Sequence, residues 1–151
     1  MGADLSRFME KALQEADKAF RREEVPVGAV LAGEDGRIIA RAHNRTIELN
    51  DPSAHAEILV LRQGASLRKN YRLNGCIMVV TVEPCLMCMG AIIHARLSHL
   101  VFGTWDPKWG AAGSLFDIPG DPRLNHHVKV TSGILEEKSR KLMQEFFRLR
   151  R

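Results

Sequence analysis

Apolar side chains near the start of the chain recur every three or four residues, from Leu5 to Phe20, with charged residues between them. This spacing predicts an amphipathic helix that ends at about Arg22, and not a signal peptide. Helical spacing returns at residues 54–68 and again at residues 135–150. The chain is therefore expected to contain at least three helices, each with one apolar face.

Shorter apolar runs between these helices predict β-strands. Residues 27–32 and 37–42 flank a turn-forming Gly-Glu-Asp-Gly segment, which predicts a β-hairpin. Further runs predict three more strands, at residues 76–82, 99–102 and 128–131. A helix connects the first two of these three strands, so we expect them to be parallel. Strands that alternate with helices indicate a layered α/β architecture.

The segment between the last two predicted strands, residues 103–127, shows no clear periodicity and is long for a loop, which indicates function or mobility. It contains Trp105 and Trp109, on either side of Lys108. Exposed indoles beside a lysine could stack on a base of single-stranded RNA. Both indoles could equally pack inside the protein, so the sequence assigns a role to neither.

Composition sets the broad class of the protein. With 151 residues, 45% of them hydrophobic and 26% charged, the chain is expected to form a single globular domain over residues 1–151. No stretch approaches the roughly 20 apolar residues that a membrane span requires. Three cysteines are an odd number, which fits a reducing, cytoplasmic setting better than a disulfide framework. A net charge of +4 suits a polyanionic partner.

Four residues in two short motifs carry the candidate chemistry. His55 and Glu57 belong to a His-Ala-Glu segment, and Cys85 and Cys88 belong to a Pro-Cys-x-x-Cys segment. One imidazole and two thiolates are ligands that zinc readily takes, and three protein ligands leave a fourth position open, as in catalytic zinc sites. The remaining cysteine, Cys76, lies in a predicted strand and is expected to be a small core residue.

Local helix geometry explains the spacing of the ligands. Pro84 is expected to open a helix, because proline is tolerated in a first helical turn. Cys85 and Cys88, three residues apart, would then share one helix face, where the helix N-terminus favours thiolates. His55 and Glu57 lie at the head of the predicted helix 54–68. The sequence therefore predicts two helix starts that face each other across a metal ion.

Glu57 is one residue too near His55 to form the usual helical pair of ligands, so we interpret it as a proton carrier. Water bound to zinc has a pKa of roughly 7, and a neighbouring carboxylate can move its proton to a substrate nitrogen and then to a leaving amine. His-x-Glu followed by Pro-Cys-x-x-Cys is the known signature of zinc-dependent nucleobase deaminases. The predicted reaction is therefore hydrolytic removal of an exocyclic amino group.

Several further segments indicate which family of deaminases the chain resembles. They include residues 24–29, 43–45, 51–57, 83–88, 102–103, 110–114, 124–126 and 146–148. With these segments the chain resembles the cytidine-deaminase-like superfamily over nearly its whole length, and within it the bacterial tRNA-specific adenosine deaminases. The resemblance implies a three-layer α/β/α fold with a central mixed five-stranded sheet. It also implies Zn²⁺ as cofactor, a tRNA anticodon stem-loop as partner, a homodimer, and conversion of the wobble adenosine to inosine.

The same resemblance implies which residues bind zinc, catalyse the reaction and contact the substrate. His55, Cys85 and Cys88 would hold the zinc ion, and Glu57 would be the catalytic residue. Substrate would contact Asn44, Ala56, Pro84, Asp106, Lys108, Asn125, His126, Phe147 and Arg148. Asn44 can both donate and accept hydrogen bonds, which fits reading of a purine edge or a ribose, although an asparagine at a strand end is also a common cap. The arginine-rich end, up to Arg151, is a candidate RNA-contacting edge.

Two alternative functions stay open at the level of sequence. A deaminase of free guanine or cytosine would use the same zinc site. A structural zinc module that binds RNA or a partner without catalysis is the alternative from another class. Glu57 argues against the structural module, because a purely structural site would fill its fourth position with a ligand.

Overall fold

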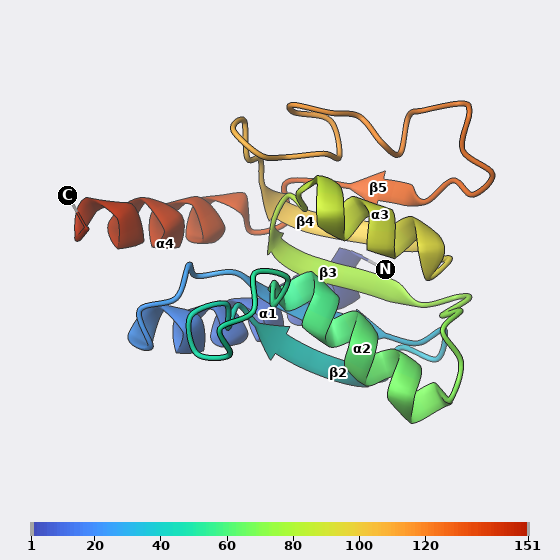
Figure 1. The fold of residues 1–151 in the computed structure, drawn as a ribbon, viewed down its shortest axis with the longest axis horizontal. Helices are drawn as coiled ribbons and strands as arrows, with labels where there is room; N and C mark the ends of the chain where they lie inside the picture. The colour runs from blue at the N-terminus through green and yellow to red at the C-terminus, as the bar shows by residue number, and fades with distance from the viewer. Residues whose placement is uncertain (1, 151) are drawn as a thin grey trace.

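The computed structural model describes residues 2–150, which leaves Met1 and Arg151, the last residue of the candidate RNA-contacting edge, outside the described residues. Four helices and five strands follow one another along the chain (Figure 1). Their order is α1 (Gly2–Arg21), β1 (Gly28–Ala32), β2 (Ile38–His43), α2 (Ala56–Arg68), β3 (Ile77–Val82), α3 (Leu86–His94), β4 (His99–Thr104), β5 (Lys129–Thr131) and α4 (Glu136–Arg148).

The five strands form one mixed sheet in the order β2-β1-β3-β4-β5. Strand β1 pairs antiparallel with both β2 and β3. Strand β3 pairs parallel with β4, and β4 pairs parallel with β5. The predicted hairpin, the parallel pair at residues 77–82 and 99–104, and the mixed five-stranded sheet are therefore confirmed.

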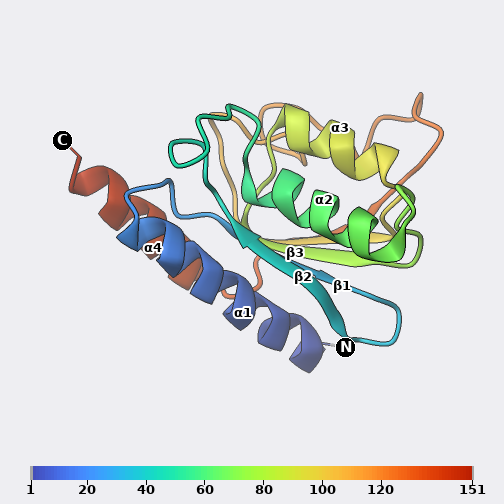
Figure 2. The ribbon, with the colours of Figure 1, turned by 60° about the horizontal axis from the view of Figure 1, so that its bottom comes forward.

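Helices cover both faces of the sheet, with α1 and α4 on one side and α2 and α3 on the other (Figure 2). Alternate residues of the central strands divide between the two sides, as the pleat requires. Leu31 of β1 and Met78 of β3 pack in the core that contains Val60 of α2. Their neighbours Val30 and Val79 pack in the core that contains residues 8, 9 and 12 of α1. This arrangement confirms the predicted three-layer α/β/α fold.

The helix starts differ from the prediction in a way that matters for the site. Helix α2 begins at Ala56 and α3 at Leu86, each two residues later than predicted. His55 and Cys85 are instead the N-caps, with extended backbone angles (ψ of 152° and 177°). Pro84 therefore precedes the helix and does not open it. Its carbonyl accepts a hydrogen bond from the Ala111 N–H at 2.8 Å, which holds the segment before α3 against the following loop.

The predicted long loop is confirmed, although β4 extends to Thr104 before the loop begins. Two isolated β-bridges order it, one between Cys85 and Gly110 and one between Ala112 and Asp117. The first bridge ties the loop directly to the N-cap of α3. Among the helices of residues 2–150, none has the length and apolar character needed to cross a bilayer.

Cys76, which is predicted to be a small core residue, and His99 both have structural roles. Cys76 is fully buried in the core between the sheet and helices α2 and α3. The ring Nε2 of His99 lies 2.8 Å from the Thr131 hydroxyl, which connects β4 to β5.

Candidate active site

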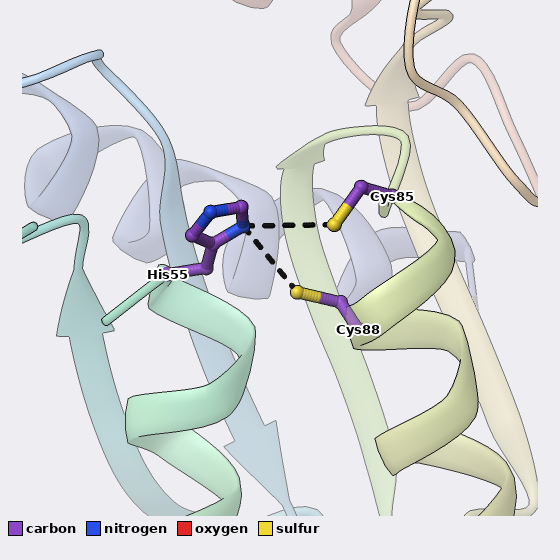
Figure 3. A group of neighbouring side chains, drawn as sticks. All are labelled: His55, Cys85 and Cys88. Carbon is purple, nitrogen blue, oxygen red and sulfur yellow. Dashed lines mark hydrogen bonds between the residues drawn. The ribbon is translucent and has the colours of Figure 1, made fainter. Parts of the chain in front are cut away.

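Three side chains from the starts of α2 and α3 converge on one point (Figure 3). The His55 Nδ1 atom lies 3.7 Å from the Cys85 sulfur and 3.6 Å from the Cys88 sulfur. Cys88 is buried, whereas His55 and Cys85 are half-buried. The structure thus brings together three residues that lie up to 33 positions apart in the chain, as predicted.

The geometry of this group fits a tetrahedral zinc ion. Zinc bonds of about 2.3 Å to sulfur and about 2.0–2.1 Å to nitrogen, at tetrahedral angles, place a sulfur and a nitrogen ligand roughly 3.6 Å apart. The two nitrogen–sulfur distances of 3.7 and 3.6 Å match that separation. One imidazole and two thiols are also a donor set that suits zinc.

Electrostatics at the group favour the ionised form of one thiol, that of Cys85, whereas the Cys85 sulfur and burial raise the pKa of the Cys88 thiol. The hydrogen bond from Cys88 and the proximity of His55 lower the pKa of the Cys85 thiol to about 4. The Cys85 sulfur in turn raises the pKa of His55 above its usual value, with the Glu57 carboxylate adding to the effect. Negative charge is therefore stabilised on the Cys85 sulfur, which prepares the site for a cation.

Glu57 lies in the first turn of α2 and is only 4% exposed. Burial raises the pKa of its carboxyl group to about 7. Its Oε1 atom has no hydrogen-bond partner among the described residues. A buried polar atom without a partner costs free energy, and such atoms concentrate where a ligand is to be bound. Glu57 is also one of the residues that line the cavity next to His55 and Cys85.

The cavity has a volume of about 680 Å³, which lies within the usual range for small-molecule sites. Besides His55, Glu57 and Cys85, its lining includes four residues predicted to bind substrate: Asn44, Asp106, Lys108 and Phe147. These four come from the end of β2, the loop after β4, and helix α4. The cavity therefore joins segments that are distant in the chain around the candidate metal site.

Asn44 has a structural contact in addition to its place in the cavity wall. Its Oδ1 atom accepts the Ala56 backbone N–H at 2.7 Å, which fixes the first residue of α2 next to His55. The amide oxygen of Asn44 therefore has a structural role at the start of α2, and the substrate contact predicted for this residue stays a prediction. The Ala56 N–H already has this protein partner, and the substrate contact predicted for Ala56 stays a prediction.

The remaining predicted substrate residues do not line the cavity. The ring Nε2 of His126 lies 2.6 Å from the Leu97 carbonyl oxygen, beyond the far end of α3, and Asn125 is the exposed residue beside it. Arg148 forms an ion pair with Glu145 and lines a neighbouring hollow together with Phe147. Pro84 lies between two lining residues, Glu83 and Cys85, without being one. The RNA contacts proposed for these four residues stay predictions.

A buried carboxylate that sequence analysis missed holds the loop after β4. Glu83 is 3% exposed, and its two oxygens accept the backbone N–H groups of Asp106, Ala112 and Ser114 at 2.9–3.0 Å. The Ser114 hydroxyl donates a further hydrogen bond at 2.5 Å. One side chain thus fixes both ends of the loop segment that carries Asp106 and Lys108. The only signal in the sequence is the position of Glu83 directly before Pro-Cys.

A second buried carboxylate holds another segment of the cavity wall, at residues 46–48. Glu24 is 1% exposed and accepts hydrogen bonds from the backbone N–H groups of Ile47 (3.2 Å) and Glu48 (2.8 Å) and from the Thr46 hydroxyl (3.3 Å). Thr46 is itself a cavity residue. Two segments of the cavity wall are therefore held by glutamates that are not candidate metal ligands.

Comparison with known proteins agrees with this geometry. A family model described as the cytidine and deoxycytidylate deaminase zinc-binding region matches residues 3–104, which include His55, Glu57, Cys85 and Cys88. The chain belongs to this deaminase family. It is a zinc-dependent deaminase, and the three converging side chains are its candidate zinc ligands.

Sequence similarity to individual relatives shows which branch of the deaminase family the chain resembles. The tRNA-specific adenosine deaminase of Haemophilus influenzae is 48% identical over 145 residues, which cover 96% of this chain and 84% of that protein. The enzyme of the same name from Agrobacterium fabrum is 47% identical over 149 residues, which cover 99% of this chain and 97% of that protein. The resemblance to this branch of the family, predicted from sequence motifs, is therefore confirmed.

Solved structures give the same result for the fold. A structure from studies of A-to-I editing by tRNA:A34 deaminases superimposes with a TM-score of 0.87 and 48% identity, covering 90% of this chain and 98% of that one. A guanine deaminase from Nitrosomonas europaea superimposes with a TM-score of 0.78 at 25% identity, covering 93% of this chain and 83% of that one. The cytidine-deaminase-like fold of the deaminase is confirmed.

Substitution Glu83→Gln is expected to destabilise the deaminase by about 2–4 kcal/mol, because each buried donor left without an acceptor costs roughly 1–3 kcal/mol. The amide nitrogen of glutamine would face backbone N–H groups that now donate to a carboxylate oxygen. Urea unfolding measures the change. Glu23→Gln, at an exposed position, is the control and should stay within about 0.5 kcal/mol of the parent. Equal stability of the two variants would show that Glu83 does not hold the loop.

Proposed function

We propose that this chain catalyses the hydrolytic deamination of adenosine to inosine at the wobble position of a tRNA anticodon loop. The observation that carries the reaction type is the buried Glu57, which lines a cavity with His55 and Cys85 and whose carboxyl group has an oxygen without a hydrogen-bond partner within residues 2–150. The substrate is proposed from the similarity to tRNA-specific adenosine deaminases, which extends over nearly the whole chain.

His55, Cys85 and Cys88 are the residues that would hold zinc, and their three ligand atoms lie within 4.8 Å of one another. Bound zinc supplies an activated water molecule at neutral pH, because it lowers the pKa of that water to about 7. The three residues come from two N-caps and one first helical turn. Their positions are therefore set by the backbone at the starts of α2 and α3.

Glu57 would move the protons of the reaction. Its carboxylate accepts a proton from the attacking water and donates it to the adenine ring nitrogen next to C6, where the new C–O bond forms. It then transfers the second proton of the water to the exocyclic amino group, so that the C6–N bond breaks and ammonia leaves. A pKa of about 7 suits a group that must both accept and donate near neutral pH.

The cavity walls would bind the target nucleotide after it leaves its stack. Extrusion of a base costs least in a single-stranded loop, which fits an anticodon loop as substrate. Asn44 offers an amide group to the base or ribose, and Lys108 offers a positive charge to a phosphate. Phe147 offers an aromatic surface on the α4 side of the cavity. The net charge of +4 is compatible with RNA as the partner.

We also propose a homodimer, a single domain spanning residues 1–151, and a cytoplasmic location. Exposed apolar side chains on α3 and on the loop after β4 support a second copy as partner; they are Leu86, Met87, Leu115 and Phe116. A single domain is supported because both hydrophobic cores pack on opposite faces of one sheet. The cytoplasmic location is proposed because a tRNA substrate is found there.

A deaminase of free guanine is the second candidate, since a guanine deaminase shares the fold at 25% identity. The non-catalytic zinc module is disfavoured, because a buried carboxyl group with an unpartnered oxygen in the cavity has no purpose in a structural site. The sequence similarity to the tRNA enzymes is much higher than that to the guanine deaminase, and for this reason we place the tRNA substrate first.

An assay of ammonia release separates these candidates. The purified zinc-loaded protein is incubated with an anticodon stem-loop that has adenosine at the wobble position, with the same stem-loop carrying guanosine there, and with free adenine, guanine and cytosine. We expect ammonia and inosine from the first substrate alone. Turnover of free guanine with an inert stem-loop would establish the guanine deaminase instead, and no turnover of any substrate would favour the non-catalytic module.

A further inference from the structure

The two tryptophans of the loop after β4 have different environments. Trp105 packs edge-to-face on the buried Phe102, with ring centroids 4.9 Å apart, and its ring lies against Gly113. Trp109 lines the cavity, is 63% exposed, and belongs to neither hydrophobic core. Packing on the core therefore explains Trp105, whereas the exposed indole of Trp109 at the cavity has no structural partner among the described residues.

The backbone that carries Trp109 is firmly held. The Asp106 carboxylate accepts the N–H groups of Lys108 (3.1 Å) and Trp109 (3.2 Å), and the Asp106 carbonyl accepts the Gly110 N–H at 2.7 Å. Asp106 is itself fixed through its own N–H, which donates to Glu83 at 2.9 Å. The indole is thus presented from a turn whose backbone is already fixed, so little backbone ordering is needed when it binds a ligand, which favours affinity.

The position of Trp109 identifies the kind of ligand. A target base that enters the cavity stays covalently linked to its two neighbours, and these must remain at the mouth. Lys108, adjacent in sequence and also lining the cavity, supplies a positive charge for the connecting phosphate. An exposed indole beside a lysine is a combination that binds single-stranded nucleic acid by stacking.

We propose that Trp109 is a stacking platform for the nucleobase next to the target adenosine, and that it contributes to substrate selection outside the reacting centre. This inference rests on the proposed function, because it requires an RNA loop as substrate. Trp109 is neither a candidate metal ligand nor the proton carrier, so we expect it to act on binding and not on the chemical step. The expected effect therefore falls on KM and not on kcat.

Kinetics of matched variants test this role. Trp109→Ala should raise KM for the stem-loop about 5- to 100-fold with little change in kcat, the range expected for loss of one base–aromatic stack. Trp109→Phe keeps an aromatic ring and should restore most of the affinity. Tyr71→Ala removes another exposed aromatic, in the segment after α2, and should leave KM unchanged. An unchanged KM in Trp109→Ala would overturn the proposal.

Abasic stem-loops locate the stacked base and exclude a merely structural effect of the substitution. Removing the base on one side of the target adenosine should raise KM for the parent protein, and should add nothing to the effect of Trp109→Ala. Equal penalties in the parent and in Trp109→Ala, on both sides of the target, would contradict stacking. A structural disturbance by the alanine would instead leave the abasic penalty in place.

Fluorescence provides a readout that does not depend on turnover. The chain has two tryptophans, so Trp105→Phe leaves Trp109 as the single indole and preserves an aromatic contact with Phe102. We expect quenching of its emission by the stem-loop in a saturable titration. If the stem-loop binds and quenches but releases no ammonia, the proposed function fails while the stacking role stands. If ammonia is released without quenching, the stacking role fails and the proposed function stands.

Discussion

Replacing Glu57 by glutamine is expected to slow adenosine deamination by about 10²–10⁴-fold, while the protein keeps its fold and its zinc. Glutamine has nearly the same shape as glutamate, but its amide cannot accept a proton from water and pass it to the base. The side chain is buried, and burial raises the pKa of the carboxyl group to about 7, so the protein environment already tolerates a neutral group there. Loss of activity would therefore not reflect loss of structure.

Three measurements on the same preparation check the Glu57→Gln result: the single-turnover rate on the stem-loop, the zinc content, and the midpoint of thermal unfolding. Glu23→Gln, at an exposed position, is the matched control and should keep full activity. A Glu57→Gln variant that deaminates at the parental rate would remove this residue from the mechanism. A variant that loses zinc as well would show that the carboxyl group takes part in metal binding.

Replacing Cys88 by alanine is expected to abolish zinc binding at micromolar metal and, with it, deamination. Cys88 and Cys76 are both fully buried cysteines, yet only the Cys88 sulfur lies near the His55 ring, at 3.6 Å. Loss of one of three ligands removes most of the binding free energy, and this energy also stabilises the folded state. The unfolding midpoint of zinc-loaded Cys88→Ala should therefore fall well below that of the parent.

The substitution Cys76→Ala is the control for this experiment. It removes a sulfur of the same size from the core and is expected to cost about 1 kcal/mol of stability, with zinc content and deamination rate unchanged. Zinc is measured by chelator titration of each purified variant. Equal zinc content in Cys88→Ala and Cys76→Ala would show that Cys88 is not a ligand.

Much of the fold follows from local patterns in the sequence. The helices and strands were predictable because their apolar periodicities are long and uninterrupted, and the parallel pairing of β3 with β4 follows from the helix between them. The pairing of β1 with β3 has no local signal, since it joins residues 29–32 to residues 77–80 across the whole of α2. Only the resemblance to the deaminase family predicted that these two strands belong to the same sheet.

The candidate site also contains residues that the sequence predicts and residues that it does not. His55, Cys85 and Cys88 were predictable because a metal site imposes residue types and short spacings that survive without knowledge of the fold. Glu83 and Glu24 could not be predicted, because glutamate is usually exposed and their partners are backbone N–H groups in loops that lie 23–31 and 23–24 residues away in the chain. Similarly, only the observed packing separates Trp109, at the cavity, from Trp105.

X-ray absorption at the zinc edge of the purified protein tests the central claim most directly. The account predicts one zinc ion per chain, with two sulfur ligands at about 2.3 Å and the remaining ligands nitrogen or oxygen at about 2.0–2.1 Å. In Cys88→Ala the two-sulfur signal should disappear. A zinc ion surrounded by four protein ligands, or a fully active protein that contains no zinc, would contradict the account.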